Sequence, residues 1–523
     1  MQPQAGESVT VQDPSANSIS NAQSQTPQPA PSQLRTRWPE WCAVSFYAAL
    51  VSFAIPYHEP WADEAQAWQL ARSLPLGALF KTYIRYEGSP GLWHFFLWIL
   101  IRAHIGYSAM HWICGAIALA AASLLIFASP LPRYLKLTLP FTSFLLFQYA
   151  VVARNYVLVP ILLFLVAWCW KKHPLTLALA LGLLANTALH AAAISSGLAV
   201  VFAIEQLRAG SLRNPALRRK LALGSLIVVA LYGIAIWTAW PPHDLGLTRV
   251  RGESHTIFDH AIVSLVWGIC QPWILSIPFW IVIAAWFSAR RKLLYLLPVL
   301  FFAIFSGEVY ANWWHVGLLV PTLVCLLWIT WPPPGAVKSR VETIGGFAMA
   351  FMIATQILWS GYALFFDHYH AYSPDRAAAA FLKPLVQQGD RVAITYIDNL
   401  GNHAFAGVGI LPYFDHNIYA NQANPFWWWS DLDTTEDNFN QILPTHPQLV
   451  LVEIRFYHRV DSIDLDQPKF NAVQKAGYKF SRAYCGSIPE QFDAGLTLCH
   501  VIFQHDDATG STTDSQRYVP VSR

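Results

Sequence analysis

Charged residues are scarce in this chain. Asp, Glu, Lys and Arg together make up 12% of its 523 residues, whereas hydrophobic residues make up 54%. A soluble domain usually carries about 25% charged residues, so most of this chain cannot be an ordinary soluble fold. The chain also lacks an internal repeat, a glycine-rich phosphate loop and the Cys and His spacing of zinc fingers. We therefore expect neither a P-loop enzyme nor a nucleic-acid partner.

The amino-terminal segment lacks large apolar side chains. Its first 34 residues are mainly Gln, Ser, Pro and Ala, a composition that cannot bury enough surface to become ordered. It also lacks a basic start, an apolar stretch and a cleavage site, so it is not a signal peptide. We predict a disordered cytosolic tail over residues 1–36 and an uncleaved membrane anchor near residue 41.

Long apolar runs dominate the next part of the chain. About 30 Å of hydrocarbon requires roughly 20 apolar residues in a helix, and several runs here are near the short limit. We predict an α-helical polytopic membrane protein over residues 37–365 with about 11 transmembrane helices. The runs are 41–57, 111–130, 137–152, 157–170, 174–189, 191–207, 221–240, 273–289, 293–307, 315–331 and 343–365.

Basic residues predict the orientation of these helices. Six clusters are almost free of acids, and they share one face if every second connection is cytoplasmic. All six clusters are cytoplasmic only if residues 92–104 do not cross the membrane. About 13 helical residues at 1.5 Å each cover only roughly 20 Å, which is less than the bilayer thickness. We predict a juxtamembrane or re-entrant helix there, which keeps residues 58–111 on the outer face of the cytoplasmic (inner) membrane; a twelfth crossing is the alternative. The clusters are Arg35 and Arg37; Arg133 and Lys136; Lys171 and Lys172; Arg208, Arg213, Arg218, Arg219 and Lys220; Arg290, Arg291 and Lys292; Lys338 and Arg340.

From about residue 366 the composition becomes that of a soluble fold. A helix is predicted over 376–388, and strands are predicted over 391–397, 448–454 and 497–504. We predict a small extracytoplasmic α/β domain over residues 366–505 with a frayed tail over 506–523. Of seven cysteines, Cys485 and Cys499 lie in this domain, where an oxidising compartment would allow a disulfide. Their spacing does not decide whether they are bonded.

Four carboxylates follow the first apolar run: Glu59, Asp63, Glu64 and Glu87. Unpaired charges at a membrane face are costly, so these residues are candidates for a functional role. Asp63 and Glu64 are neighbours, so on a helix they point about 100° apart and only one can face a given atom. We favour Asp63 as the acid that faces the reacting atom, and we keep Glu64 and Glu87 as further catalytic candidates. The alternative is that Asp63 and Glu64 form an acidic first turn that complements the helix dipole. Glu87 lies in the sequence RYEGSPGLWHF, where Gly and Pro interrupt regular structure before a short helix. It faces a cavity or pairs with a local base such as Arg85.

Arg154 lies between two apolar runs in the sequence VVARNYVLVP. We expect Arg154 at the outer membrane face, where its charge needs a counter-ion. A lipid phosphate or diphosphate supplies one with bidentate geometry. One of the carboxylates described above is the alternative counter-ion. Asn155 and Tyr156 offer hydrogen bonds beside it. We predict that Arg154, Asn155, Tyr156, His94 and His190 bind substrate. For His94, a general base, a metal ligand and an interfacial side chain are the alternatives.

A second polar loop covers residues 241–260. Its carboxylates and imidazoles could bind a divalent metal, although their spacing matches no compact ligand motif. Its titratable residues are His243, Asp244, Arg249, Arg251, Glu253, His255 and Asp259.

Four features together resemble the GT-C fold glycosyltransferases, in particular the RgtA/B/C/D-like and protein-mannosyltransferase/ArnT-like groups. These features are an outer loop that begins with DEA at 63–65, a second signature RYEGSPGLW at 85–93, an ARNY turn at 153–156 and a soluble outer tail. The resemblance covers roughly residues 41–365 and is strongest over 57–200.

The resemblance implies a polyprenyl-phosphate-linked sugar donor whose lipid tail stays in the bilayer. Asp63 then matches the first-loop acid that serves as base or faces a metal, Glu87 the acid of the second signature, and Arg154 a donor-phosphate contact. A metal bound by Glu87 and His255 would follow from the same resemblance. The chain departs from the family at Ser89, where a histidine often precedes the proline, so no role is carried over to that position.

We therefore expect a glycosyltransferase that works with lipid-linked sugars and transfers them to a glycan, lipid or protein. No cofactor other than the divalent metal is implied. A transporter or flippase for lipid-linked head groups is the alternative, although it would place charges at mid-membrane depth and break helices in paired halves. A third reading is a non-catalytic envelope protein whose outer domain binds a partner.

Overall fold

The computed structural model describes most of the chain: residues 37–242, 257–270, 272–309, 311–333, 339–397, 407–427, 438–456, 460, 462–490, 493–505 and 518–520. The predicted tail over 1–36 lies outside these residues, and so does nearly all of 506–523. The chain divides into two compact units, Met1–Pro39 and Glu40–Arg523. All contacts described below lie within the second unit.

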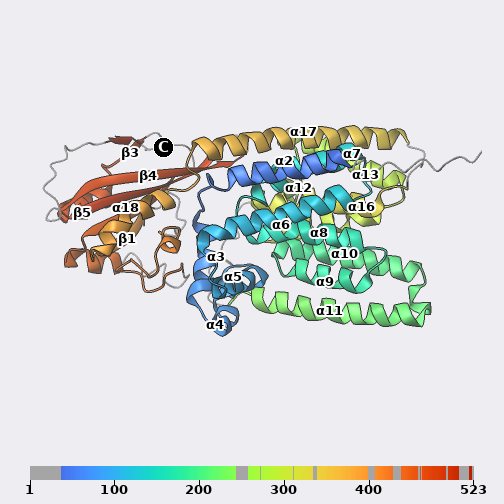
Figure 1. Cartoon of the computed structure of the whole chain (residues 1–523), viewed down its shortest axis with the longest axis horizontal. Coiled ribbons are helices and arrows are strands. Elements are labelled where there is room, and N and C mark those ends of the chain that lie inside the picture. Colours follow the sequence, from blue (N-terminus) through green and yellow to red (C-terminus); the bar gives the residue numbers. More distant parts are fainter. Residues whose placement is uncertain are drawn as a thin grey trace, which may run out of the picture. The chain divides into compact units, whose positions relative to one another are not determined.

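Among the described residues, five helical segments are long and apolar enough to cross a membrane, and they define an integral membrane protein. They are α6 (Tyr107–Ala128), α10 (Leu189–Arg208), α11 (Pro215–Ala239), the segment Trp313–Thr330 that contains α15 (Trp313–Val316) and α16 (Leu319–Thr330), and α17 (Arg340–Tyr369) (Figure 1).

Shorter helices complete the bundle. Each predicted apolar run contains helical turns, but the number of crossings stays a prediction because several helices are shorter than the bilayer requires. These are α2 (Trp38–Ala54), α7 (Arg133–Thr138), α8 (Leu158–Cys169), α9 (Pro174–Ala185), α12 (Ile257–Val266), α13 (Ser276–Ala289) and α14 (Leu297–Glu308), together with the short turns η2 (Leu139–Phe141), η3 (Phe144–Gln148), η4 (Asn155–Val157), η5 (Ser211–Arg213), η7 (Trp273–Leu275) and η8 (Leu293–Leu296).

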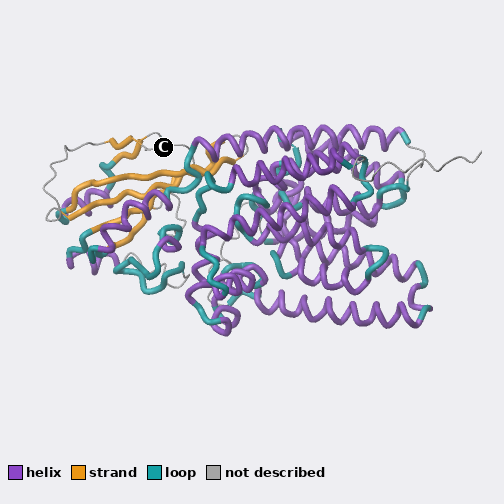
Figure 2. Tube along the Cα trace, viewed as in Figure 1, coloured by secondary structure: helices purple, strands orange, loops and turns teal. Residues whose placement is uncertain are grey.

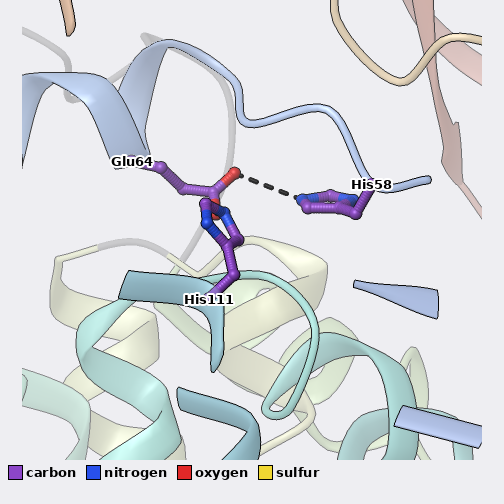
Figure 3. Close-up of side chains that lie close together, drawn as sticks. All are labelled: His58, Glu64 and His111. Atoms are coloured by element: carbon purple, nitrogen blue, oxygen red, sulfur yellow. Dashed lines mark hydrogen bonds and ion pairs between the residues drawn. The ribbon is translucent and has the colours of Figure 1, made fainter. Parts of the chain in front are cut away.

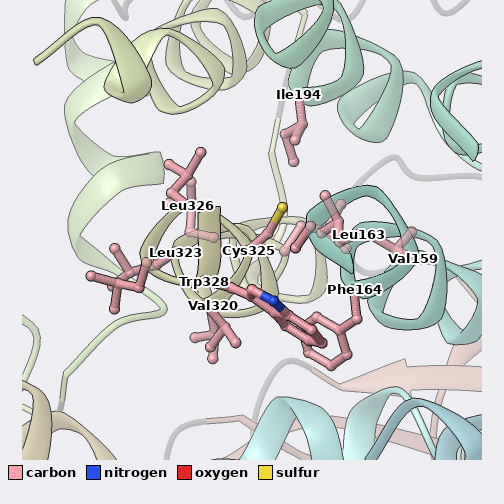
Figure 4. Packing of buried hydrophobic residues seen from close by; sticks show 14 of the residues in the cluster. Val159, Leu163, Phe164, Ile194, Val320, Leu323, Cys325, Leu326 and Trp328 are labelled. Atoms are coloured by element: carbon pink, nitrogen blue, oxygen red, sulfur yellow. The ribbon is translucent and has the colours of Figure 1, made fainter. Parts of the chain in front are cut away.

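Helix α16 lies at the centre of the bundle. All of its residues from Leu319 to Thr330 are buried, as expected for a helix that is apolar on every side. Leu163 and Phe164 of α8 and Ile194 of α10 belong to the same core (Figure 4). By contrast, α11 exposes apolar side chains, and Leu226 is 64% exposed. In a bilayer such a surface contacts lipid.

The segment after α2 folds into short helices. They are α3 (Ala62–Ser73), α4 (Leu76–Lys81), η1 (Tyr83–Tyr86) and α5 (Leu92–Arg102). The 11 residues of α5 extend only roughly 16 Å, too short to cross the bilayer unaided. Gly91 permits the close packing before α5, because a Cβ there would lie 2.7 Å from the Phe80 ring. A short helix therefore forms over the predicted segment, and its side of the membrane stays a prediction.

A mixed four-stranded sheet follows the bundle in the chain, and Figure 2 shows its strands in orange. The strand order is β1-β2-β5-β4, in which only β1 and β2 are parallel. The predicted helix and three strands are present, whereas β4 was not predicted. The elements are α18 (Asp375–Gln387), β1 (Val392–Ile397), η9 (Leu411–Tyr413), η11 (Leu443–Thr445), β2 (Leu449–Phe456), β3 (Ser462–Asp464), α20 (Pro468–Lys475), β4 (Tyr478–Glu490), β5 (Asp493–His505) and β6 (Tyr518–Pro520).

The central strand β2 is buried on both faces. Val450 and Val452 pack into one hydrophobic cluster, and Leu449 and Leu451 pack into another on the opposite side. Such a strand reads as a continuous apolar run, which made it easy to predict. The sheet therefore has a core of its own on each face.

Cys485 and Cys499 are joined by a disulfide bond. They lie directly opposite each other on the paired strands β4 and β5. The sequence alone left this pairing open, because the register of β4 against β5 decides it and β4 was not predicted.

Candidate active site

A cavity of about 610 Å³ lies where the short helices after α2 meet the bundle. Its wall combines α3, the turn after η1, the ARNY turn and the start of α10 with Trp427 and Arg455 from the part that follows α17. Residues far apart in the sequence therefore meet in one polar hollow. The predicted site residues that line it are Asp63, Glu87, His94, Arg154, Asn155, Tyr156 and His190.

An ion pair joins Asp63 and Arg154 across this cavity. Arg154 Nη2 lies 2.8 Å from Asp63 Oδ2, and both side chains retain partial exposure. The guanidinium carbon lies 5.6 Å from the Trp61 ring centroid, 5.2 Å from that of Tyr156 and 5.3 Å from that of Trp314. Aromatic faces at these distances stabilise a cation. The aromatic residues thus hold the guanidinium in place beside the carboxylate.

Glu87 lies beside this pair at the end of η1. Gly88 follows with φ +60°, a left-handed turn that favours glycine and that directs the chain back toward α5. Gln66 Nε2 donates a hydrogen bond of 3.0 Å to Glu87 Oε1. The pKa of Glu87 is raised to about 7, mainly by burial and also by the Asp63 charge, while the Gln66 hydrogen bond and the Arg154 charge act in the opposite direction. A carboxyl group that titrates near neutral pH is suited to proton transfer.

Gln66 also connects the cavity to the carboxyl-terminal part of the chain. Its Nε2 donates to the Trp427 carbonyl at 2.8 Å, and its Oε1 accepts from the Trp427 backbone N–H at 2.8 Å. This reciprocal pair positions Trp427 in the cavity wall. Nothing in the sequence pattern singled out Gln66, because its partner lies 361 residues away.

Three histidines of the described part of the chain line the cavity: His94, His190 and His315. The rings of His190 and His315 are stacked with centroids 4.1 Å apart. His94 is buried, and neither of its ring nitrogens has a hydrogen-bond partner among the described residues. An imidazole in that state can bind a hydroxyl group of a ligand. His315 was not predicted, since it lies inside an apolar run.

Asn155 has a structural contact within the ARNY turn. Its Nδ2 donates to the Thr187 carbonyl at 2.8 Å, which ties this turn to the segment before α10. Tyr156 contributes its ring to the cavity wall and to the surroundings of Arg154.

Glu64 points away from the cavity. Its carboxylate is fully buried and lies beside His58 and His111 (Figure 3). Oε1 accepts a hydrogen bond of 2.6 Å from the Ala153 backbone N–H, and Oε2 accepts one of 3.1 Å from the Trp61 N–H. The two neighbouring acids of α3 therefore differ. Asp63 faces the cavity, whereas Glu64 accepts hydrogen bonds from the backbone of Trp61 and of Ala153.

The charge state of Glu64 follows from these contacts. Burial alone would favour the neutral acid, but the His58 charge and the hydrogen bonds from His111 and His58 hold the pKa of Glu64 well below its usual range. No spacing along the chain predicts this cluster, because His111 is 47 residues from Glu64.

The metal ligands suggested by the resemblance are only partly described. Glu87 lines the cavity, whereas His255 lies outside the described residues, as do the other titratable residues of the 241–260 loop except Asp259 and His260. Asp259 belongs to α12, a helix that overlaps the end of the predicted loop.

No protein-family profile and no curated protein sequence matches this chain. Solved structures with a similar fold include two of ArnT. A crystal structure of ArnT from Cupriavidus metallidurans bound to undecaprenyl phosphate matches with a TM-score of 0.50 and 11% identity, over 88% of this chain and 97% of that chain. The apo structure of the same protein matches with a TM-score of 0.51 and 11% identity, over 89% and 98%. The chain therefore has an ArnT-like fold over most of its length, which agrees with the ArnT-like part of the resemblance seen in the sequence motifs.

Proposed function

We propose that this protein is a membrane glycosyltransferase that moves a sugar from a polyprenyl-phosphate donor to an acceptor hydroxyl. The observation that carries the proposal is the Asp63–Arg154 ion pair in the wall of a 610 Å³ cavity, beside Glu87. It combines an anion-binding cation with carboxylates that can accept a proton. The fold supports the proposal, because the ArnT structure that it resembles is bound to undecaprenyl phosphate.

Arg154 is the proposed donor-phosphate contact. A guanidinium binds phosphate through two parallel hydrogen bonds, and its charge stabilises the negative charge that develops when phosphate leaves. Because Arg154 is paired with Asp63 before the donor binds, the phosphate competes for the same guanidinium. Donor binding then weakens the ion pair and frees the Asp63 carboxylate.

Asp63 is the proposed general base. Its carboxylate accepts the proton of the acceptor hydroxyl while the acceptor oxygen forms a bond to the anomeric carbon. The bond from that carbon to the phosphate oxygen breaks, and its electron pair leaves with polyprenyl phosphate. Attack from the face opposite the phosphate inverts the anomeric centre.

Glu87 and the aromatic residues are proposed to bind the sugar. With a pKa of about 7, Glu87 exists near neutral pH as both carboxyl and carboxylate, so it can donate or accept a hydrogen bond from a sugar hydroxyl. Trp61, Trp314 and Trp427 line the same cavity and offer flat apolar faces to a sugar ring. His94 and His190 add hydrogen-bonding groups from two further helices.

We propose that the cavity opens on the extracytoplasmic side of the inner membrane. The Cys485–Cys499 disulfide supports this side, since such bonds persist in oxidising compartments. The basic residues support it as well: α10 begins at the cavity with His190 and ends at Arg208, roughly 28 Å along the helix. Arg208 begins the basic cluster that extends to Lys220, and positive charge marks the cytoplasmic side.

The experiment is a transfer assay with the full chain in lipid. It is supplied with a panel of radiolabelled polyprenyl-phosphate sugars and, as a control, with nucleotide sugars, together with glycan, lipid and peptide acceptors. We expect transfer from a lipid-linked donor and none from nucleotide sugars. Asp63→Asn should abolish that transfer, whereas Asp415→Asn, which changes an exposed aspartate outside the cavity, should not. Transfer from nucleotide sugars alone, or from no donor at all, would refute the proposal.

A further inference from the structure

Two histidines and a glutamate meet in the protein interior beside the cavity. His58 follows α2, Glu64 lies in α3 and His111 lies in α6, and their exposed fractions are 1%, 0% and 4%. Figure 3 shows both imidazole rings directed at the one carboxylate. None of the three lines the cavity. They therefore form a separate cluster that the proposed sugar transfer does not use.

The distances within this cluster suit a metal ion. His111 Nε2 lies 2.9 Å from Glu64 Oε1, and His58 Nε2 lies 3.4 Å from Glu64 Oε2. One ligand atom from each residue can be chosen so that all three lie within 4.8 Å of one another. A tetrahedral zinc ion bound at about 2.0 to 2.1 Å places its ligand atoms roughly 3.3 Å apart. The three side chains thus already surround a point that a zinc ion could occupy with small adjustments.

Asp367 supplies a second, independent indication. Its carboxylate oxygens lie 3.2 Å and 3.3 Å from His58 Nδ1. A carboxylate that accepts the Nδ1–H proton of a histidine directs the Nε2 lone pair outward, and this arrangement is common behind metal-bound histidines. Here that lone pair faces Glu64. Two acceptors 3.4 Å apart repel each other unless a cation or a proton lies between them.

The local charges favour a divalent cation in that position. Glu64 and Asp367 are two buried carboxylates, with exposed fractions of 0% and 3%. Buried charges need compensation by charges of the opposite sign. Without a cation, a proton on His58 would balance one of these carboxylates; one divalent cation replaces that proton and balances both carboxylates while both imidazoles stay neutral. Two histidines and a glutamate are moreover a ligand set that zinc adopts in proteins, with one further position for water or another group.

We propose that His58, Glu64 and His111 bind a zinc ion whose fourth position is left to water or another group, with Asp367 orienting His58. The ion would link the end of α2 to α3 and α6. Through Glu64 it would also fix the backbone N–H of Ala153, the residue before Arg154. This site is distinct from the Glu87 and His255 pair that the family resemblance suggested, and it does not depend on the proposed sugar transfer.

The first test measures the metal content of the full chain purified in detergent without chelator. We expect one zinc ion per chain in the wild type and at least about tenfold less in His111→Gln. Glutamine can still donate a hydrogen bond to Glu64 but binds zinc poorly, so this variant separates a metal site from a hydrogen-bonded cluster. Glu87→Gln is the matched control and should retain the ion, because Glu87 lies in the cavity.

The second test uses cobalt in place of zinc and His111→Cys. The wild-type chain should take up one Co²⁺ ion and show the visible absorption of a four-coordinate site. His111→Cys should retain the ion and gain a thiolate-to-cobalt band in the near ultraviolet, which identifies position 111 as a ligand. This readout stays decisive if His111→Gln fails to fold.

Two results would overturn the proposal. One is a wild-type chain that carries no zinc and takes up no cobalt, which would leave the cluster as an ion-paired network with a protonated His58. The other is an ion that persists in His111→Gln and is lost in Glu87→Gln, which would assign the metal to the cavity.

Discussion

The Glu64 carboxylate accepts a 2.6 Å hydrogen bond from the backbone N–H of Ala153, the residue that precedes Arg154. Glu64 is itself adjacent to Asp63, which forms the ion pair with Arg154. Asp63 is therefore the chain neighbour of Glu64, and Arg154 is the chain neighbour of Ala153, whose N–H is bound by Glu64. Both partners of the ion pair thus lie next to a residue of the same hydrogen bond. The geometry of the pair depends on a residue that does not face the cavity.

Removing that carboxylate should destabilise the protein. Glu64→Ala leaves the Ala153 and Trp61 N–H groups and His111 without their acceptor, and breaking a buried ionic network in this way costs about 3 to 5 kcal/mol. Thermal unfolding in detergent should show a clearly lower Tm. Asp415→Ala, an exposed carboxylate, should stay within about 0.5 kcal/mol of the wild type. Similar Tm values for the two variants would contradict the structural role of Glu64.

Arg154→Lys should weaken donor binding more than it slows turnover. Lysine keeps the charge but loses the planar, bidentate contact with phosphate and the stacking on Trp61, Tyr156 and Trp314. Loss of one hydrogen bond to a charged group costs about 1.5 to 3 kcal/mol, so KM for the donor should rise roughly 10- to 100-fold. Steady-state kinetics with varied donor measure this. Arg72→Lys is the control, since Arg72 binds the Phe414 and Leu411 carbonyls outside the cavity wall; an equal rise in KM there would count against the assignment.

The pKa of Glu87 predicts a window of pH-dependent stability. Burial raises this pKa from 4.5 to about 7, so between these values the folded chain keeps a proton that the unfolded chain releases. The stability provided by the neutral carboxyl is therefore complete below about pH 4.5 and is lost as the pH rises through 7. Glu87→Gln cannot ionise. The difference between its Tm and that of the wild type should therefore increase from about pH 4.5 to about pH 7, and it should stay constant at higher pH.

Glu59 provides a parallel check of this prediction. Burial raises its pKa to about 7 as well, so Glu59→Gln should gain stability over the same pH range. Tm differences that do not change with pH for either variant would show that these carboxyls titrate normally in the folded chain.

The predicted orientation can be mapped with single cysteines in a Cys42→Ser background. Ser108 is exposed at the start of α6, and Leu212 is exposed between α10 and α11. A membrane-impermeant maleimide added to intact cells should label Ser108→Cys, whereas Leu212→Cys should react only after permeabilisation. Labelling of Ser108→Cys only after permeabilisation would mean that the segment containing α5 crosses the membrane.

The sequence predicted those parts of the fold that depend on local composition. Apolar runs locate the helices of the bundle. Whether a helix is stable in lipid depends on the apolar side chains of that one segment, so local composition is enough to predict it. Strand β2 was predicted for the same reason, as a continuous apolar run. Strand β4 was not, because Arg482 and other polar residues interrupt its pattern, and α12 was not, because Asp259 and His260 near its start resembled a polar loop.

The candidate site was predicted only in part. A charged residue in apolar surroundings can be recognised from its own position in the sequence, and Asp63, Glu87 and Arg154 were predicted in this way. The Gln66–Trp427 pair and the cluster of His58, Glu64 and His111 depend on contacts between distant segments, and no spacing along the chain encodes them. Such contacts become visible only when the fold has brought the segments together.

The most direct test of the proposed function is to measure donor binding and sugar transfer separately in Asp63→Asn. Asparagine has the shape of aspartate but cannot act as a base, so the variant should bind the lipid-linked donor at least as tightly as the wild type. It should transfer the sugar about 10² to 10⁴ times more slowly. Transfer at the wild-type rate by a folded variant would show that Asp63 is not the base and would contradict the central claim.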